Sequence, residues 1–402
     1  MFSALRRRFV DVAAVAPRTY WFLWWGTLIN RLGGFVVPLL TIYLITVRRV
    51  SVADAGGVVA AFGVGAIVAS LAGGYLADHL GRRATLLISL FGGAIAMAVL
   101  GMVRTLGPIT MMVGVVGFTT ELYRPAVNAV VADVVPAPQR IQAYGLLHWV
   151  INIGFSFAAI IGGLLADIDF TVLFIADAAT TAIYGVIVAF AVPETRPERV
   201  VHTAQVRPSR SWVTDRALVV YMAITFFLAL LPNQASALSA HMTRQGFSPA
   251  AFGMVFAVNG IFVIALQPAI AAWNARRDAT RVVAAAALLY GGGFALHGLA
   301  TGVWLHAIAV MVWTLGEIFE SPTRASIIAA LAPADARGRY QGAIAMTFSA
   351  AQLTGPKLGT WTLQYAGPGV LWSSCLVIGV LVAFAMIVTA PARRRRMASR
   401  AV

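Results

Sequence analysis

The second half of the chain repeats the glycine and proline pattern of the first half at a fixed separation of 197 residues. These two residue types have backbone roles that others rarely fill, so a common register in them indicates a common architecture. About two glycine matches would arise by chance at one separation, whereas five occur in one frame, which predicts two related halves. The matching pairs are Ser51 and Ser248, Gly56 and Gly253, Gly63 and Gly260, Gly101 and Gly298, Pro125 and Pro322, Pro136 and Pro333, Arg140 and Arg337, Gly145 and Gly342, and Gly162 and Gly359.

The composition indicates a protein that is embedded in a lipid bilayer. The chain is 60% hydrophobic and 11% charged, whereas a soluble domain has about a quarter of its residues charged. Lipid must therefore cover much of the folded surface. The single cysteine, Cys375, excludes an internal disulfide. A duplicated apolar chain of this kind is typical of secondary transporters, which are built from two halves around a central site.

Hydropathy over windows of about 19 residues predicts an all-α membrane protein with twelve transmembrane helices. Each apolar segment is long enough to cross the bilayer, in some cases with a tilt. The expected fold is two pseudo-symmetric bundles of six helices. The predicted spans, numbered first to twelfth, are 19–47, 52–77, 84–104, 106–134, 138–166, 168–192, 214–241, 247–274, 279–302, 303–330, 336–365 and 367–390.

The arginines are divided unevenly between the two sets of loops that these spans create. One set holds 22 arginines, and the other holds only Arg48, Arg49, Arg104 and Arg244. Basic residues concentrate on the cytoplasmic side, so both termini are expected in the cytoplasm. The same rule accounts for the net charge of +15, and a nucleic-acid partner is therefore not expected. The predicted organisation is an N-terminal bundle (1–192), a polar cytoplasmic connector (193–213) and a C-terminal bundle with a basic tail (214–402).

A polar motif stands between the second and third spans. Residues 73–83 read Gly-Gly-Tyr-Leu-Ala-Asp-His-Leu-Gly-Arg-Arg, which resembles the loop signature G-x-L-A-D-x-x-G-R-[KR] of the major facilitator superfamily. The aspartate would lie near the two arginines or against the positive N-terminus of a helix in the other half. The alternative is an ordinary turn with cytoplasmic arginines. The second half has Ala275 at the aspartate position, so this conformational latch is asymmetric. The latch residues are Gly74, Asp78, Gly81, Arg82 and Arg83.

A second resemblance lies in the fifth and eleventh spans. The glycines of the fifth span have the spacing of the antiporter signature G-x8-G-x3-G-P-x2-G-G, although Ala158 and Ala159 replace its Gly-Pro pair, and the eleventh span retains such a pair. Small residues let helix backbones approach closely, and proline sets a kink. Generic helix packing is the alternative interpretation. The signature residues are Gly145, Gly154, Gly162, Gly355, Pro356 and Gly359.

The resemblance to the major facilitator superfamily extends over the whole chain. Residues 316–322, 332–333, 337–340 and 355–356 are most similar to its bacterial multidrug efflux branch. The resemblance implies that the first, fourth, seventh and tenth spans line a central cavity. It also implies a monomer in the bacterial cytoplasmic membrane that uses the proton gradient and needs no cofactor.

Ionisable residues inside the predicted spans are the candidates for proton coupling, because each costs about 3 kcal/mol to insert at the bilayer centre. Glu121 and Arg124 are three residues apart and share a helix face, and Arg324 is placed to pair with Glu320. Glu317 is then left as the expected proton carrier, with Glu121 as the second candidate.

Other polar residues in the spans complete the expected substrate cavity. Arg31 either faces this cavity or permanently bridges Glu121 and Glu317 and braces the two halves. His148 titrates near neutrality and is either a proton gate or a hydrogen-bonded packing residue. Asp177 is expected to have a local structural role. The candidate cavity residues are Asn30, Arg31, Phe35, Arg124, His148, Asn152, Asn233, Gln234, Glu320 and Arg324.

The motifs of common enzyme classes are missing from the sequence. It contains no P-loop, so ATP is not the expected energy source, and no Cys/His cluster predicts a metal site. We expect proton-coupled efflux of amphipathic, drug-like molecules. The alternative is proton-coupled uptake of a sugar, a peptide or a carboxylate metabolite, which Arg31, Arg124 and Arg324 favour because guanidinium groups hold carboxylates. A non-transporting receptor is a third class.

Overall fold

The computed structural model describes residues 15–136, 139–195, 214–274, 276–332 and 337–398, and within these ranges the side chains of Leu71, Gly74, Asp78, Ile141, Pro268, Ala271, Ala272 and residues 337–339 lie outside the description. In the described part, all regular elements are helical. They are α2 (Arg18–Leu32), α3 (Val36–Thr46), α4 (Val52–His79), α5 (Arg82–Met102), α6 (Leu106–Val134), α7 (Arg140–Ile168), α8 (Phe170–Ala191), α9 (Arg216–Leu230), the 3-10 turn η3 (Pro232–Gln234), α10 (Ala235–Arg244), α11 (Pro249–Asn274), α12 (Ala279–Leu296), α13 (Val303–Leu331), α14 (Arg337–Tyr365), α15 (Gly367–Val388) and α16 (Ala390–Ala398).

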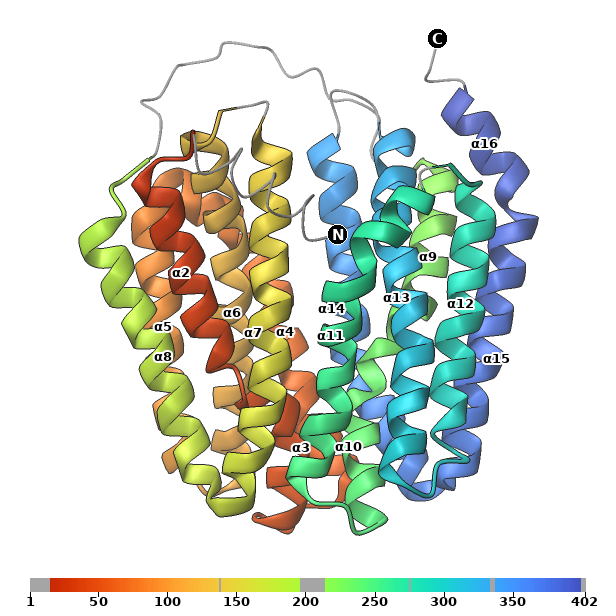
Figure 1. The fold of residues 1–402 in the computed structure, drawn as a ribbon, viewed down its shortest axis with the longest axis horizontal. Helices are drawn as coiled ribbons and strands as arrows, with labels where there is room; N and C mark the ends of the chain where they lie inside the picture. Colours follow the sequence, from red (N-terminus) through yellow and green to blue (C-terminus); the bar gives the residue numbers. More distant parts are fainter. Residues whose placement is uncertain (1–14, 137–138, 196–213, 275, 333–336, 399–402) are drawn as a thin grey trace.

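The helices form two groups that stand side by side. Figure 1 shows α2 to α8 on the left and α9 to α16 on the right, with long helices running between the two ends of the molecule. The short helices α3 and α10 lie at the lower end and α16 lies at the upper end. Most of the connector (196–213) and the expected counterpart of the latch aspartate, Ala275, lie outside the described residues.

The helix bounds confirm the 197-residue register. Helices α6, α7 and α8 have the same lengths as α13, α14 and α15, and each pair is separated by 197 residues at both ends. Pro125 lies inside α6, and its repeat partner Pro322 lies inside α13. The glycine and proline pattern therefore does reflect a duplicated backbone.

Eleven segments of the described chain are long and apolar enough to cross a membrane, and they match eleven of the twelve predicted spans. The remaining one, 336–365, corresponds to α14, which has the length of its counterpart α7. Helix α14 carries more polar side chains, among them Gln352 and Lys357. It nevertheless packs lengthwise against α4, as expected of a twelfth membrane helix.

The first span is not one continuous helix. Helix α2 ends at Leu32 and α3 begins at Val36, and this break follows from the sequence between them. Gly33 and Gly34 disfavour helix, and Pro38 lacks the N–H that would bond to the carbonyl of Gly34. The seventh span is interrupted at the equivalent place by η3, where Pro232 follows Leu231.

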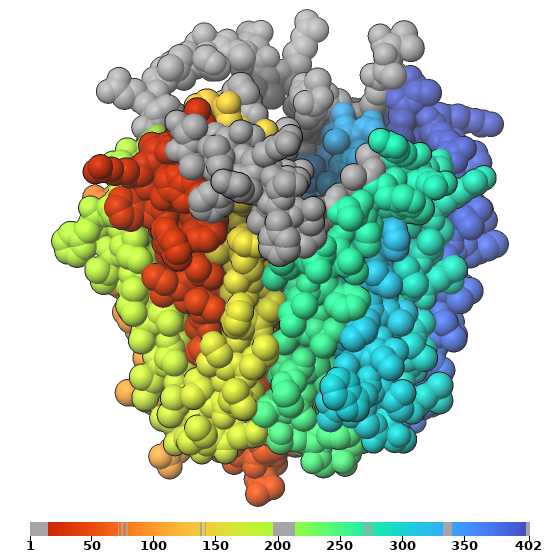
Figure 2. All heavy atoms as spheres, viewed as in Figure 1, coloured from red at the N-terminus to blue at the C-terminus, as the bar shows by residue number. Residues whose placement is uncertain are grey.

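The two halves pack together at the end that holds α3 and α10. There, α4 contacts α14, and Gly56 lies so close to Thr360 that a Cβ atom would collide with it. The backbone N–H of Ala53 donates to Gln364 Oε1 of the other half at 2.8 Å. On the opposite side of the molecule α7 packs against α11 through Gly253. Figure 2 shows these two helices in contact along the lower part of one face.

Candidate functional site

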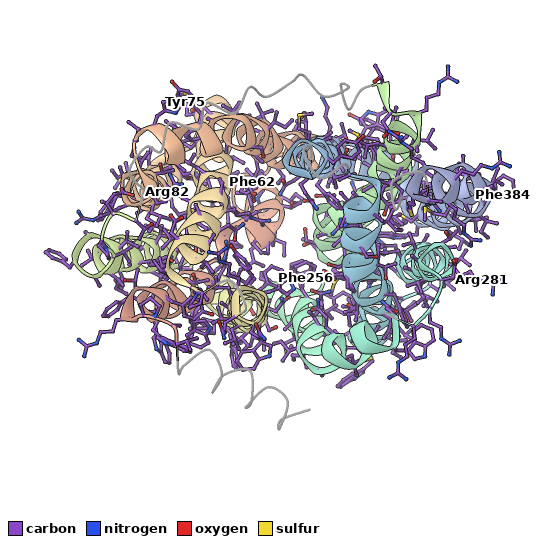
Figure 3. The ribbon with its side chains drawn as sticks, turned by 90° about the horizontal axis from the view of Figure 1, so that it is seen from above. Phe62, Tyr75, Arg82, Phe256, Arg281 and Phe384 are labelled. Atoms are coloured by element: carbon purple, nitrogen blue, oxygen red, sulfur yellow. The ribbon has the colours of Figure 1, made fainter. Side chains whose placement is uncertain are left out.

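A cavity of about 700 Å³ lies among the helices of the first half and extends to one residue of the second half, Gln352 on α14. Figure 3 views the molecule from above, with Phe62 and Phe256 between the two groups of helices and Phe384 on the outer rim. Phe62 is part of the cavity wall. The wall is mostly apolar, and its polar and charged residues include Asn30, Arg31, Glu121, Arg124, Asn128, His148 and Asp177.

Glu121 and Arg124 form the predicted ion pair on α6. The Nε atom of Arg124 lies 3.1 Å from Glu121 Oε2, and the arginine side chain is 63% exposed whereas that of the glutamate is 16% exposed. Both residues line the cavity. The pair therefore places a carboxylate and a guanidinium together at the surface of the cavity, where an ionic contact is weaker than in a dry core.

Arg31 lies in the last turn of α2 and also lines the cavity. Glu121, Arg124 and Asp177 are the charged groups whose fields act on its guanidinium. Its Nε atom is buried and has no hydrogen-bond partner among the described residues. The expected permanent bridge from Arg31 to Glu121 and Glu317 is not formed, because in the described chain Glu121 pairs with Arg124 and Glu317 bonds to an amide.

Asp177 on α8 is 6% exposed and touches the same cavity. Its Oδ2 atom accepts a hydrogen bond from the backbone N–H of Val36, the first residue of α3, at 3.4 Å. The Thr181 side chain lies near the carboxyl group. Thr181 Oγ1 in turn accepts from Asn30 Nδ2 at 2.8 Å. Asp177 therefore belongs to a hydrogen-bonded group at the break in the first span.

The acidic residues of the tenth span lie on α13. Arg324 Nε is 3.3 Å from Glu320 Oε1, as predicted, and the guanidinium also stacks over the ring of Phe348 at 4.0 Å. Glu317 is held differently, because Asn259 Nδ2 of α11 donates to its Oε2 at 2.7 Å. Glu317 is not among the residues that line the cavity described above, and a shared cavity of Glu317 with Arg31 and Glu121 stays a prediction.

His148 and Asn152 lie on the face of α7 that points toward the second half. The imidazole of His148 lies near the side chain of Gln267 on α11, in the second half. Asn152 Nδ2 donates to the backbone carbonyl of His148 at 2.8 Å, so this side chain bonds to the preceding turn of its own helix. His148 lines the cavity and Asn152 does not.

The signature glycines pack against the broken segments of the first and seventh spans. A Cβ atom at Gly162 would collide with Phe35, and one at Gly154 would collide with Arg31. In the second half Gly355 and Gly359 lie equally close to Asn233 and Gln234. Pro356 lies inside α14. Small residues are therefore needed where α7 and α14 meet the interrupted helices.

Gly145 is a different case, because it is exposed and no described atom lies close to where its Cβ would be. Its repeat partner Gly342 is also exposed and uncrowded. The close approach predicted from the fifth-span signature is made by Gly154 and Gly162, whereas Gly145 takes no part in it.

Asn233 and Gln234 satisfy the break in the seventh span with amide groups. Asn233 Nδ2 donates to the carbonyl of Ala229 at 2.8 Å. Gln234 Nε2 donates to the carbonyl of Leu230 at 2.9 Å and to that of Gly355 at 3.4 Å. These side chains bond to carbonyl groups of the backbone, and neither lines the cavity.

The described partners of the latch arginines lie in the same half as the arginines. Arg82 Nε bonds to Asp133 Oδ2 at the end of α6 at 3.2 Å. Glu194, just after α8, accepts the backbone N–H groups of Arg82 at 2.9 Å and Arg83 at 3.1 Å. Gly81 has a φ of 102°, a backbone angle that residues with a Cβ atom rarely adopt, so glycine is favoured at this turn.

Gly74 and Asp78 lie on α4, but their surroundings lie outside the described residues. The described part of the latch fastens the N-terminus of α5 to the ends of α6 and α8. Sequence reasoning missed Asp133 and Glu194, and also Asn259, the partner of Glu317. Asp133 and Glu194 are acidic residues at the ends of spans, and Asn259 is a polar residue inside an apolar span. These positions were the signal in the sequence that each side chain needs a polar partner.

The family model described as Major Facilitator Superfamily matches residues 23–234 and, a second time, residues 218–401. These two matches together cover nearly the whole chain, in the order of its two halves.

Two curated relatives and one solved structure illustrate the similarity. The chain is 26% identical to the tetracycline resistance protein, class C, of Escherichia coli, over 82% of this chain and 83% of that protein. It is 23% identical to the Na(+), Li(+), K(+)/H(+) antiporter of Planococcus maritimus, over 72% of this chain and 77% of the other. Its fold matches a crystal structure of a POT family transporter with a TM-score of 0.81 at 15% identity, covering 94% of this chain and 97% of that one.

Proposed function

Since the chain belongs to the Major Facilitator Superfamily, whose members are membrane transporters that need no cofactor, we propose that this one exports amphipathic small molecules in exchange for protons. The protein is a multi-pass secondary transporter and not an enzyme. In the proposed cycle the halves, residues 1–192 and 214–402, rock about the central cavity while the connector 193–213 joins them.

The proposed orientation places both termini in the cytoplasm of a bacterial cell. It rests on the arginine distribution, because positive residues gather on the cytoplasmic side. On this assignment α3, α10 and the contacts between Ala53 and Gln364 face outward. The halves are then closed on the outside, and we assign the structure to the inward-facing form of the transport cycle.

The lining of the cavity supports an amphipathic substrate and is the observation that carries the proposal. Its apolar wall, which includes Phe62, Leu147 and Phe155, suits a flat or lipophilic body. A few polar groups, among them Asn30 and Asn128, are available to orient such a molecule. Apolar pockets with few polar groups are typical of small-molecule sites, and the similarity to a tetracycline resistance protein is consistent with this substrate class.

Glu317 remains the proposed proton carrier. Its described partner is the neutral amide of Asn259, whereas Glu320 pairs with Arg324. A carboxylate held by an amide is easier to protonate than one held by a guanidinium, because protonation breaks no ion pair. Glu121 is the second candidate, since its pairing with the exposed Arg124 at the cavity surface leaves it within reach of water.

Transport in proteoliposomes with an imposed pH gradient tests the proposal, with ethidium as a fluorescent amphipathic cation. We expect gradient-driven flux in the native protein and a loss of about tenfold or more in Glu317→Gln. Asp54→Asn is the matched control, because this carboxylate is exposed and lies in the first turn of α4. Native-level flux in Glu317→Gln would remove Glu317 from the role, and no flux in the native protein would overturn cation efflux.

The second candidate function is proton-coupled uptake of a solute that carries a carboxylate. The observation that favours it is the buried Nε atom of Arg31, which lines the cavity and has no partner among the described residues. A guanidinium in this position holds a carboxylate well. Counterflow of labelled carboxylates that is lost in Arg31→Gln, with no ethidium flux, would favour this function over efflux.

A further inference from the structure

The break in the first span contains a carboxylate that the proposed transport cycle does not use. Helix α3 begins at Val36 after Gly33, Gly34 and Phe35, so its first N–H groups have no partner within the helix. The N-terminus of a helix carries a partial positive charge and attracts an anion. The Oδ2 atom of Asp177 accepts the N–H of Val36, and thus Asp177 supplies that anion from α8.

The same carboxylate faces a cation across the break. Arg31, in the last turn of α2, acts electrostatically on Asp177. Arg31 on one side and the start of α3 on the other therefore both attract the ionised carboxylate. A proton on the carboxyl group weakens both attractions at once, because it removes the negative charge on which they depend.

The polar and charged groups near Asp177 come from several helices. On α8 itself Thr180 and Thr181 are neutral neighbours; Thr180 bonds to the backbone carbonyl of Asp177, and Thr181 lies near its carboxyl group. From α6, Glu121, Arg124 and Tyr123 act on Arg31. From α7, His148 lines the same cavity. The residues that α3 and α5 contribute to the cavity wall, among them Val37 and Ser89, are uncharged.

Asp177 is also placed where a proton can reach it. Its side chain is buried, but it forms part of the cavity wall. The residues that pack around the break are small or rigidly held, since a Cβ atom at Gly33 would collide with Thr180 and one at Gly162 would collide with Phe35. A change in the attraction between Asp177 and α3 therefore acts on a tightly packed joint.

Helix α3 continues from this joint to the closed end of the molecule. There it packs against α10 of the second half, and the two short helices lie together at the lower end in Figure 1. The angle between α2 and α3 thus contributes directly to the contact between the halves.

We propose that Asp177 is a proton-binding site that sets the angle of the break in the first span, so that its ionised form holds α3 against α10 and its protonated form releases that contact. The inference rests on the proposed coupling of transport to protons and adds the residue through which a proton changes the outer contact. It assigns Glu317 no part in this step. Breaks in membrane helices are common sites for ions, because the half-helix ends face a cavity.

The decisive experiment measures the outer distance without any substrate. Spin labels at Val47, 49% exposed after α3, and Leu299, 76% exposed between α12 and α13, report the separation of the halves by pulsed electron resonance. A Cys375→Ala background removes the single native thiol. We expect the distance to lengthen between about pH 8 and about pH 5, the range in which perturbed carboxylates titrate.

Asp177→Asn should hold the long-distance population at both pH values, because the amide keeps the shape of the acid without its charge. Asp54→Asn and Glu317→Gln should keep the native titration. The proposal is overturned by a native protein whose distance does not change, or by an Asp177→Asn variant that titrates like the native protein. If Glu317→Gln loses transport and keeps the titration, the two roles are separate.

A measurement on the native chain covers the case in which Asp177→Asn does not fold. Hydrogen exchange of the Val36 amide, corrected for the intrinsic effect of pH, should rise several-fold at the acidic value, because the protonated carboxyl group is a poorer acceptor. The Leu44 amide, within α3, is the internal reference. Equal protection of Val36 at both pH values would also overturn the proposal.

Discussion

The two halves interrupt their first helix at the same place, but they stabilise the interruption with different chemistry. In the first half Asp177 binds the start of α3 and faces Arg31. The residue equivalent to Asp177 in the second half is Ser374, whose hydroxyl bonds to its own helix at Leu371. The second-half break is satisfied by the amide of Gln234. Duplication has kept the backbone. Among the described residues, a carboxylate binds at the break of the first half and an amide at the break of the second.

The carboxylates of the second half lie elsewhere. Glu317 and Glu320 are on α13, next to Asn259 and Arg324, whereas the equivalent positions on α6 are Thr120 and Tyr123. Each half thus has its own buried acidic group in a different part of the pseudo-symmetric frame. Two different acidic sites allow protonation to act on one half without an equal effect on the other.

The largest expected effect tests what the two joints share, which is a close-packed glycine. Gly162→Leu and Gly359→Leu place a branched side chain where Phe35 and Gln234 already lie. We expect each to destabilise the protein by about 3 kcal/mol or more, seen as lost folded yield and a lower melting temperature in detergent.

The matched controls are Gly145→Leu and Gly342→Leu, the other repeat-related pair of glycines on α7 and α14. Both positions are exposed, with open space at the Cβ position in the described chain. They should melt within a few degrees of the native protein. Equal damage at all four positions would mean that the joints are not special and that any bulk on these helices is harmful.

The second prediction tests what the two joints do not share. Asp177→Ala leaves the Val36 N–H and Arg31 without the carboxylate, and we expect a loss of about 2–3 kcal/mol in the free energy of unfolding. Ser374→Ala removes a hydroxyl that bonds within its own helix, which should cost less than about 1 kcal/mol. Chemical denaturation of both variants in the same detergent measures the difference, and similar losses would contradict the comparison.

Much of this architecture could be predicted from the sequence, because it depends on local spacing. The duplicated glycine and proline frame predicted equal helices, and helical spacing predicted the pairs of Glu121 with Arg124 and of Glu320 with Arg324. The break in the first span was not predicted, although Gly33, Gly34 and Pro38 together give the signal for it.

The contacts between helices could not be predicted in the same way. The partner of Glu317 is Asn259, which lies on another helix, and the partner of Asp177 is Val36 on a third. Such pairs depend on how far each helix is rotated about its axis, and in an apolar span the hydrophobic pattern fixes that rotation only weakly.

A third prediction concerns the end of the molecule opposite α3 and α10, where the halves again differ. Asp215 before α9 accepts hydrogen bonds from Tyr340 at 2.6 Å and from Arg396 of α16 at 3.0 Å. The equivalent residue of the first half is Arg18, which cannot accept hydrogen bonds, so the contact of Asp215 with Tyr340 and Arg396 has no counterpart there. Burial raises the pKa of the Asp215 carboxyl, but the bonds from Tyr340 and Arg396 outweigh it, and the pKa lies below its ordinary value.

A depressed pKa gives this contact a defined pH dependence. Its stabilising effect is complete above the unfolded pKa of about 4 and is lost as the pH falls through the folded value. Asp215→Asn should lower the free energy of unfolding by about 1–3 kcal/mol near neutral pH. Its melting temperature should also fall less steeply than that of the native protein as the pH is lowered below about 4. Asp167→Asn, at an exposed site, is the control. If the melting temperature of Asp215→Asn falls in acid as steeply as that of the native protein, protonation of Asp215 is not the cause of the acid sensitivity.

The smallest expected effect lies at the equivalent end of the first half. Glu194 accepts the N–H groups of Arg82 and Arg83 at the start of α5, whereas the corresponding helix of the second half, α12, is capped by its own Asp278. Glu194 is exposed. Glu194→Gln keeps one of its two oxygen acceptors, replaces the other with an NH2 group that cannot accept, and removes a screened charge, at a cost of about 1 kcal/mol.

Salt distinguishes this electrostatic contribution from a structural one. Because the charge of Glu194 is exposed, the difference in melting temperature between Glu194→Gln and the native protein should shrink as the salt concentration rises. Glu194→Ala also removes the acceptor and should keep a residual loss at high salt. If the Gln variant loses as much as the Ala variant at every salt concentration, the single remaining amide oxygen contributes nothing. The complete carboxylate, with its two acceptors and its charge, would then be needed to attach α5 to α8.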